Sequence, residues 1–192
     1  KSLEELQSIF KTHNIQKFRA KQLIDYIYHR YIFDFEDMTQ FPKDLRQWLG
    51  DNCVISLPTL ITESIAPDGK TRKILVEMTD QSRVEAVLME QHYGYSVCVS
   101  SQVGCAMGCV FCASTQGGLY RDLTVAEIIG QVVIFGALTK EEIHSVVVMG
   151  AGEPLQNYDN VLQALQLLHD PMICNISYRK MTISTCGWVP NR

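Results

Sequence analysis

The stretch Val103–Ser114, VGCAMGCVFCAS, places three cysteines, Cys105, Cys109 and Cys112, within eight residues. A glycine directly before each of the first two cysteines favours a loop over a helix or a strand. A structural zinc site usually takes four protein ligands, often from two CxxC pairs, but only Cys109 and Cys112 have that spacing here. An iron–sulfur cluster fits better, because a cubane has four irons and three thiolates leave one iron open to an outside molecule. Zinc stays an open alternative, and three unliganded thiols are disfavoured.

The sequence around this loop decides the fold class. Its apolar periodicity predicts alternating strands and helices, at 96–101, 124–138, 145–150, about 157–169 and 180–186. Strands that alternate with helices predict an α/β fold with a parallel sheet, or part of a (β/α) barrel. Because three strands are few for such a fold, and because the chain does not begin with Met, we expect a fragment whose C-terminal portion is missing.

The residues before this region predict two further units. Residues 1–55 carry three amphipathic helical patterns, the first behind a capping box of Ser2 and Glu5. Residues 56–94 alternate with a period of two and contain two turn sequences, so we expect a short antiparallel connector there. Residues 95–192 are then the first half of the α/β core.

Composition limits the classes of function. The 192 residues are 46% apolar and 20% charged, and no stretch is long enough to span a membrane. The net charge of -4 argues against a protein built wholly around phosphate contacts, although a local patch can still bind nucleic acid. Seven cysteines, three of them in one loop, fit a metal or redox site in a reducing compartment, so we expect a cytoplasmic protein.

The cysteine spacing CxxxCxxC after the first strand of an α/β unit resembles the signature of radical S-adenosylmethionine (SAM) enzymes. Several flanking segments resemble successive blocks of the RlmN/Cfr family of RNA adenine methyltransferases. They are FRAKQLIDYIY (18–28), FEDMTQFPKDLR (35–46), SVCVSSQVGCAMGCVFCAS (96–114), LYRDLTVAEIIGQV (119–132), VVVMGAGEPLQNYDNV (146–161) and MTISTCGWVP (181–190). Val103 favours RlmN, since Cfr-type proteins tend to have a cysteine there.

The resemblance implies a radical SAM (β/α) partial barrel that binds a 4Fe-4S cluster and SAM. The expected activity is methylation of C2 of an adenine in 23S ribosomal RNA, and also in tRNA, through a methyl-cysteine intermediate. C8 methylation, another radical SAM reaction such as glycyl-radical activation, and a zinc-stabilised nucleic-acid-binding module are the alternatives. We also expect a monomer, an external reductant of the flavodoxin type, no membrane partner, and no turnover by this chain alone, since the methylated cysteine lies outside it.

Carried residue by residue, the resemblance gives five further site residues beside the three cluster cysteines. Glu85 is the expected proton acceptor, although an exposed strand carboxylate is the better interpretation from sequence alone. Cys98 is expected to release the product, whereas free cysteine is more often a small buried hydrophobe. Gly152 and Glu153 are expected to hold the SAM amino group, and Ser184 to contact SAM. Without the resemblance, Gly152 and Glu153 would be interpreted as part of a turn, and Ser184 as a residue whose hydroxyl hydrogen-bonds to the backbone.

Two other features have simpler interpretations. Lys11, Lys17, Arg19 and Lys21 fall in a stretch without acidic residues, which is usually a solvated helix face. If the N-terminal unit contacts RNA, these four are the expected phosphate contacts. Cys186, where relatives often have Ser, is predicted to pack in the interior.

Overall fold

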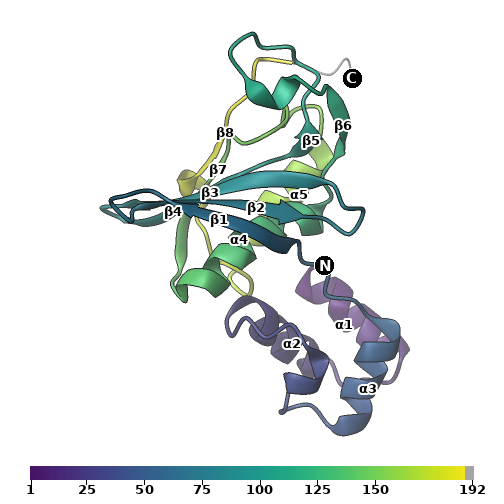
Figure 1. The fold of residues 1–192 in the computed structure, drawn as a ribbon. Coiled ribbons are helices and arrows are strands. Elements are labelled where there is room, and N and C mark those ends of the chain that lie inside the picture. Colours follow the sequence, from purple (N-terminus) through teal and green to yellow (C-terminus); the bar gives the residue numbers. More distant parts are fainter. Residues whose placement is uncertain (189–192) are drawn as a thin grey trace.

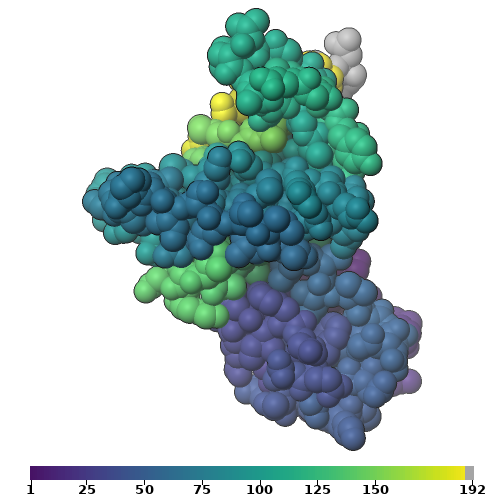
Figure 2. Space-filling model, viewed as in Figure 1, coloured from purple at the N-terminus to yellow at the C-terminus, as the bar shows by residue number. Residues whose placement is uncertain are grey.

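The structure, a computed structural model, describes residues 1–188 of the chain. Val189 and Pro190, which end the last of the resembling segments, lie outside the described residues. The first part is a helical module (Figures 1 and 2), with α1 (Leu3–Thr12), α2 (Phe18–Tyr28), a 3-10 turn (Phe35–Asp37) and α3 (Lys43–Asn52).

The predicted capping box at the start of α1 is confirmed. The Ser2 hydroxyl accepts from the Glu5 amide at 3.2 Å, and the Glu5 carboxylate accepts from the Ser2 amide at 2.7 Å. Together these bonds satisfy two amides that a helix start otherwise leaves without a partner. Behind the cap, Phe10 is buried in a small core that the three helices share, with Tyr26 and Leu49 among its members.

One six-stranded sheet forms the centre of the molecule, in the order β1-β2-β3-β4-β7-β8. Its strands are β1 (Thr59–Ile65), β2 (Thr71–Glu77), β3 (Arg83–Gln91), β4 (Gly94–Val99), β7 (Ile143–Val148) and β8 (Met181–Ile183). The first four pair antiparallel, whereas β4, β7 and β8 pair parallel. The strands expected as a connector therefore continue directly into the parallel sheet, because β3 pairs with β4.

The outer strand β1 is irregular. Its pairing with β2 shifts between Leu60 and Thr62, and all seven of its residues are exposed. Glu63 of this strand forms an ion pair with Arg72 of β2 at 3.3 Å.

Two helices, α4 (Val125–Thr139) and α5 (Tyr158–His169), cover one face of the sheet. A second capping box, of Thr124 and Glu127, starts α4. Alternate strand residues, such as Val97 and Val146, are fully buried in the core that includes both helices. Their neighbours in sequence point to the opposite side. We call that opposite side the open face and define it by Lys73, Glu85, Val87, Cys98 and Val147, which are all exposed or half-buried.

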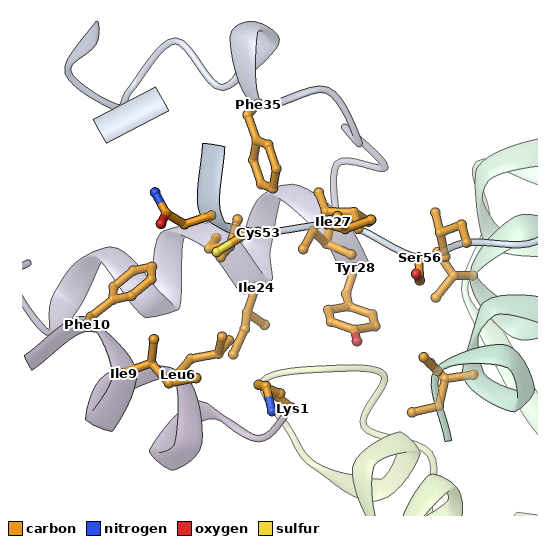
Figure 3. A pocket seen from close by; sticks show the side chains of 18 of the residues that line it. Lys1, Leu6, Ile9, Phe10, Ile24, Ile27, Tyr28, Phe35, Cys53 and Ser56 are labelled. Atoms are coloured by element: carbon orange, nitrogen blue, oxygen red, sulfur yellow. The ribbon is translucent and has the colours of Figure 1, made fainter. Parts of the chain in front are cut away.

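The helical module packs on the outer side of α4, away from the sheet (Figure 1). Close approach is possible because α4 has glycines at the contact. A side chain at Gly130 would collide with Pro58, and one at Gly136 would collide with Tyr31. Between the module and α4 lies a largely apolar cavity of about 530 Å³, to which Lys1, Ile24 and Ile27 contribute (Figure 3). None of the predicted site residues lines this cavity.

A second, two-stranded sheet of β5 (Gln102–Gly104) and β6 (Leu119–Asp122) holds the two ends of the cysteine loop. The sequence did not predict it, because strands of three and four residues show no clear period. This small sheet and its loop lie on the far side of the main sheet from the helical module (Figure 1). Among residues 1–188, no helix is long and apolar enough to cross a membrane.

Candidate functional site

The cysteine loop closes tightly where it leaves β5. The amide of Cys105 donates to the Gly118 carbonyl at 3.0 Å, which fastens the two ends of the loop together. Gly104 has a φ of +76°, and a side chain there would collide with the Gly118 carbonyl oxygen. Glycine is therefore required beside the first cysteine, both for its conformation and for space.

Thr115 ties the inside of the loop together. Its hydroxyl donates to the Cys105 carbonyl at 3.1 Å and accepts from the Gly108 amide at 2.8 Å. This tie fixes the backbone on both sides of the segment that carries the second and third cysteines. No sequence signal points to Thr115, since a single threonine in a loop has no characteristic spacing.

The three thiols lie in different surroundings. Cys105 is 8% exposed, whereas Cys109 and Cys112 are half-buried and the intervening Phe111 is 89% exposed. All three are unpaired thiols, so the loop offers the donor set that an iron–sulfur cluster uses. Within residues 1–188, however, no three Cys, His, Asp or Glu side chains are gathered closely enough to hold a metal ion. The three thiols and the hydrogen-bonded backbone that carries them fit an iron–sulfur cluster. That the thiols converge around such a cluster is part of the proposed function.

Gly152 and Glu153 follow β7 and lie against β5. The Glu153 amide donates to the Gln102 side chain at 2.8 Å, and Gln102 in turn donates to Asp122 at 2.7 Å. Gly152 has a φ of +106°, and a side chain there would meet Ser101 and Gln102 at 2.6 to 2.8 Å. The turn after β7 is thereby fixed to both strands of the small sheet, at the carboxyl ends of the parallel strands, where α/β folds bind ligands.

The Glu153 carboxylate clamps the segment after β8. It accepts from the Thr185 hydroxyl at 2.6 Å, the Cys186 amide at 2.9 Å and the Leu155 amide at 3.0 Å. Burial alone would raise the pKa of Glu153, but these hydrogen bonds outweigh it and hold the pKa below its usual range. The Glu153 side chain is thus fully engaged in positioning the segment after β8, whereas the contact expected with the SAM amino group is one of the backbone.

Ser184 and Cys186 lie on this clamped segment. Ser184 is exposed just beyond β8, and its amide donates to the Val148 carbonyl at 3.2 Å. Cys186 is exposed as well, so the prediction that it packs in the interior is wrong. A hydrogen bond to the Glu153 carboxylate raises the pKa of the Cys186 thiol, and Cys109 of the cysteine loop also interacts with it electrostatically. The turn after β7 and the segment after β8 therefore meet, and Cys109 of the cysteine loop lies within electrostatic range of them.

Cys98 and Glu85 lie on the open face, away from the two covering helices. Cys98 is half-buried, and desolvation raises the pKa of its thiol against an opposing backbone hydrogen bond from Met149. Glu85 is two residues from Val87, the direct partner of Cys98 across β3 and β4. The Glu85 carboxylate forms an ion pair at 2.9 Å with Lys73. Both residues share a face, as the alternation of each strand predicts.

Arg121 is a structural residue of this region that sequence reasoning missed. It follows the cysteine loop on β6 and forms ion pairs with Asp80 at 2.6 Å and Glu127 at 2.8 Å. These contacts raise the pKa of Arg121 and hold the pKa of Asp80 well below its usual range. They connect the exit of the loop to the β2–β3 turn and to the first turn of α4.

Comparison with known proteins agrees with this geometry. Residues 1–55 match the ribosomal RNA large subunit methyltransferase N-terminal domain, and residues 99–192 match the radical SAM superfamily. A solved structure of a radical SAM methyltransferase from Sphaerobacter thermophilus superposes with a TM-score of 0.92 at 36% identity, covering 99% of this chain and 57% of that one. The fold, the cysteine loop and these matches define a radical SAM protein, a class whose cofactors are a 4Fe-4S cluster and SAM.

The curated relatives narrow the class. A protein of Symbiobacterium thermophilum described as "Probable dual-specificity RNA methyltransferase RlmN" is 48% identical over 191 residues, and one of Clostridium perfringens with the same description is 45% identical over 189. Each alignment covers 98% of this chain, which spans about half of the relatives' length, 52% and 54%. Within the radical SAM class, the chain is similar to proteins described as RlmN, and the resemblance found in its sequence is confirmed.

Proposed function

We propose that the protein containing this chain is a radical SAM methyltransferase that methylates C2 of adenine in 23S ribosomal RNA and in tRNA. One observation carries the proposal. Hydrogen bonds join the turn at Glu153 to β5, from which the cysteine loop leaves, and to the segment that follows Ser184. Cys98 and Glu85 lie on the open face of the main sheet. The names of the relatives, which describe RNA methyltransferases, support the substrate class.

In this proposal Cys105, Cys109 and Cys112 hold the cluster, which supplies the electron that cleaves SAM. Gly152 and Glu153 present their backbone to the SAM amino group, and Ser184 contacts SAM from the neighbouring strand. The Gln102–Glu153–Thr185 bonds keep these two segments at a fixed spacing, so that SAM meets a preorganised edge rather than two mobile loops.

Glu85 and Cys98 act on the substrate side. Glu85 accepts the proton that leaves the adenine carbon, and the electron pair of that C–H bond stays on the ring. Cys98 attacks the sulfur of the methylated cysteine and forms a disulfide with it. The bond from that sulfur to the transferred carbon breaks, and this carbon keeps the electron pair of the bond and takes up a proton to become the methyl group on adenine. Since burial raises the pKa of Cys98, it rests as a thiol at neutral pH and must lose its proton before it attacks.

The remaining parts have supporting roles in the proposal. Residues 1–55 are an RNA-contacting accessory module, residues 56–94 a β connector, and residues 95–192 the first half of the catalytic core. The methylated cysteine lies outside this chain, so the chain alone does not turn over. The whole protein is proposed to act in the cytoplasm as a monomer, with a flavodoxin-type electron donor.

The test is anaerobic reconstitution of the full-length protein with iron and sulfide, followed by metal analysis and electron paramagnetic resonance with and without SAM. We expect about four irons and four sulfides per chain and a reduced-cluster signal that SAM changes, because three thiolates leave one iron open. Alanine at Cys105, Cys109 or Cys112 should abolish the signal. Alanine at Cys53, a half-buried thiol of the helical module, should leave it intact.

The position of the methyl group in the RNA product tests the remaining part of the proposal, the substrate and the site of methylation. Adenine-containing ribosomal RNA and tRNA fragments should gain a methyl group at C2, as nuclease digestion and mass spectrometry would show. A methyl group at C8 would contradict the regiochemistry alone. Bound zinc without sulfide would contradict the proposal as a whole.

A further inference from the structure

The ion pair between Lys73 and Glu85 is the starting point. Lys73 Nζ lies 2.9 Å from a Glu85 carboxylate oxygen, and both side chains are about half exposed on the open face. They are diagonal neighbours on adjacent strands, because Lys73 pairs with Val87 and Glu85 with Leu75. Lysine reaches such a diagonal neighbour through its four-carbon stem.

The sheet register shows where this pair lies relative to Cys98. Lys73 pairs with Val87, Val87 with Cys98, and Cys98 with Val147, so these four residues form one row across the sheet. Glu85 is one step beyond this row and is also a diagonal neighbour of Cys98, and such neighbours are typically about 7 to 8 Å apart. Lys73 and Cys98 flank β3 on opposite sides, so the ammonium draws the carboxylate toward the β2 side of the row.

The other ion pairs of the same strands lack this geometry. Arg83 pairs with Glu77 at 2.7 Å, and those two residues are direct partners at the far end of β2 and β3. Arg72 pairs with Glu63 on the edge strand β1. Half-exposed pairs contribute little to stability, since solvent screens them and two long side chains must be ordered. The Lys73–Glu85 pair therefore matters for the position of the Glu85 carboxylate rather than for stability.

We propose that Lys73 is a positioning residue for Glu85, one that holds the proton acceptor in one place on the open face, on the β2 side of β3. The inference rests on the proposed function, in which Glu85 takes the proton from the adenine carbon. A carboxylate without this partner samples several rotamers over an open surface, and only some of them reach the substrate. Lys73 reduces the number of rotamers that the Glu85 side chain adopts, and it does so without touching the substrate.

The test compares full-length variants in the amounts of 5′-deoxyadenosine and methylated adenine they form. Cleavage of SAM precedes the proton transfer, so Lys73→Ala should keep the rate of 5′-deoxyadenosine formation while the yield of methylated adenine falls about two- to fivefold. Lys73→Arg should restore much of that yield. Arg83→Ala, which breaks the neighbouring pair on the same two strands, should leave both quantities unchanged.

Two further measurements separate positioning from a structural role. The melting temperature of Lys73→Ala should equal that of wild type, and Lys73→Ala should have no further effect when Glu85 is already Gln. A wild-type ratio of the two products in Lys73→Ala would overturn the role of Lys73 and leave the proposed function intact. A wild-type protein that forms 5′-deoxyadenosine but never methylates adenine would overturn both.

Discussion

Glu153 is 3% exposed and nevertheless carries a carboxylate, which is costly to bury unless hydrogen bonds replace the lost water. Three donors supply them, from Thr185, Cys186 and Leu155. The pKa of Glu153 is lower in the folded protein than in the unfolded chain. Its contribution to stability is therefore complete above the unfolded pKa and is lost as the pH falls through the folded pKa.

Glu153→Gln should lower the free energy of unfolding by about 1 to 3 kcal/mol at pH 7, because the amide nitrogen cannot accept from the segment after β8. The deficit relative to wild type should shrink as the pH falls below about 4, where wild-type Glu153 also becomes protonated. Denaturant unfolding at several pH values measures this. Glu141→Gln, at an exposed site, should show no deficit at any of them. A deficit that persists unchanged at low pH would contradict the role given to the Glu153 charge.

Single residues differed in how well the sequence predicted them. The strands that carry Cys98 and Glu85 could be predicted because their alternation of apolar and polar residues is local. The hydrogen bonds of Glu153 could not be predicted from its local sequence, since its donors Thr185 and Cys186 lie on the segment after β8. Cys186 was misjudged for the same reason. Its exposure depends on a contact with a residue 33 positions away.

Among the elements, the small sheet of β5 and β6 bears most directly on the cysteine loop. Arg121 of β6 forms two-pronged contacts with Asp80 and Glu127, and it also donates to Ser82 at 3.0 Å. Planar guanidinium groups suit such paired carboxylate contacts. These contacts of Arg121 connect the end of the cysteine loop to the β2–β3 turn of the main sheet and to helix α4, which covers that sheet.

Arg121→Gln should loosen β5 and β6, because one amide cannot replace the guanidinium contacts to both carboxylates. Hydrogen exchange followed by mass spectrometry should show faster exchange in residues 102–104 and 119–122, with α1 unchanged. Since the pKa of Asp80 is held well below its usual range, the difference should persist from pH 7 down to about 4. Arg179→Gln, at an exposed position outside this sheet, is the control. Equal exchange in all three proteins would show that Arg121 does not anchor the loop.

Elements were predictable where their signals are local. Both capping boxes and the long apolar run of α4 marked their helices in the sequence. The pair β5 and β6 left no such signal, because each strand is short and its partner lies beyond the loop. The pairing of β3 with β4 was also not predicted from the sequence, since the register between two strands depends on the packing of the whole sheet.

At the scale of the whole molecule, the helical module and the cysteine loop lie at opposite ends (Figures 1 and 2). Of the four cations expected to contact RNA, Lys11, Lys17 and Lys21 are exposed on the module. Arg19 is partly buried and donates to Gln22 and to the Gln40 carbonyl. The three lysines are therefore the better candidates for phosphate contacts, and Arg19 stabilises the module.

Replacing Lys11, Lys17 and Lys21 together with Gln in the full-length protein should weaken RNA binding. The slope of log K against log salt concentration should fall by about 2 to 3, since each phosphate contact releases close to one counterion. Fluorescence anisotropy over a salt series measures this. The matched control replaces Lys70, Lys140 and Lys180, three exposed lysines outside the module, and it should keep the wild-type slope. An unchanged slope in the module variant would leave those lysines as ordinary solvated residues.

The irregular outer strand β1 has a consequence for how copies of the protein behave at high concentration. A sheet edge with unpaired amides and carbonyls can template the addition of a strand from another molecule, which is a route to aggregation. The register shift between Leu60 and Thr62 twists this edge, and the Glu63–Arg72 pair places charges along it. An incoming strand would meet a bent backbone and would have to desolvate an ion pair, so the edge disfavours the flat cross-β stacking from which fibrils grow.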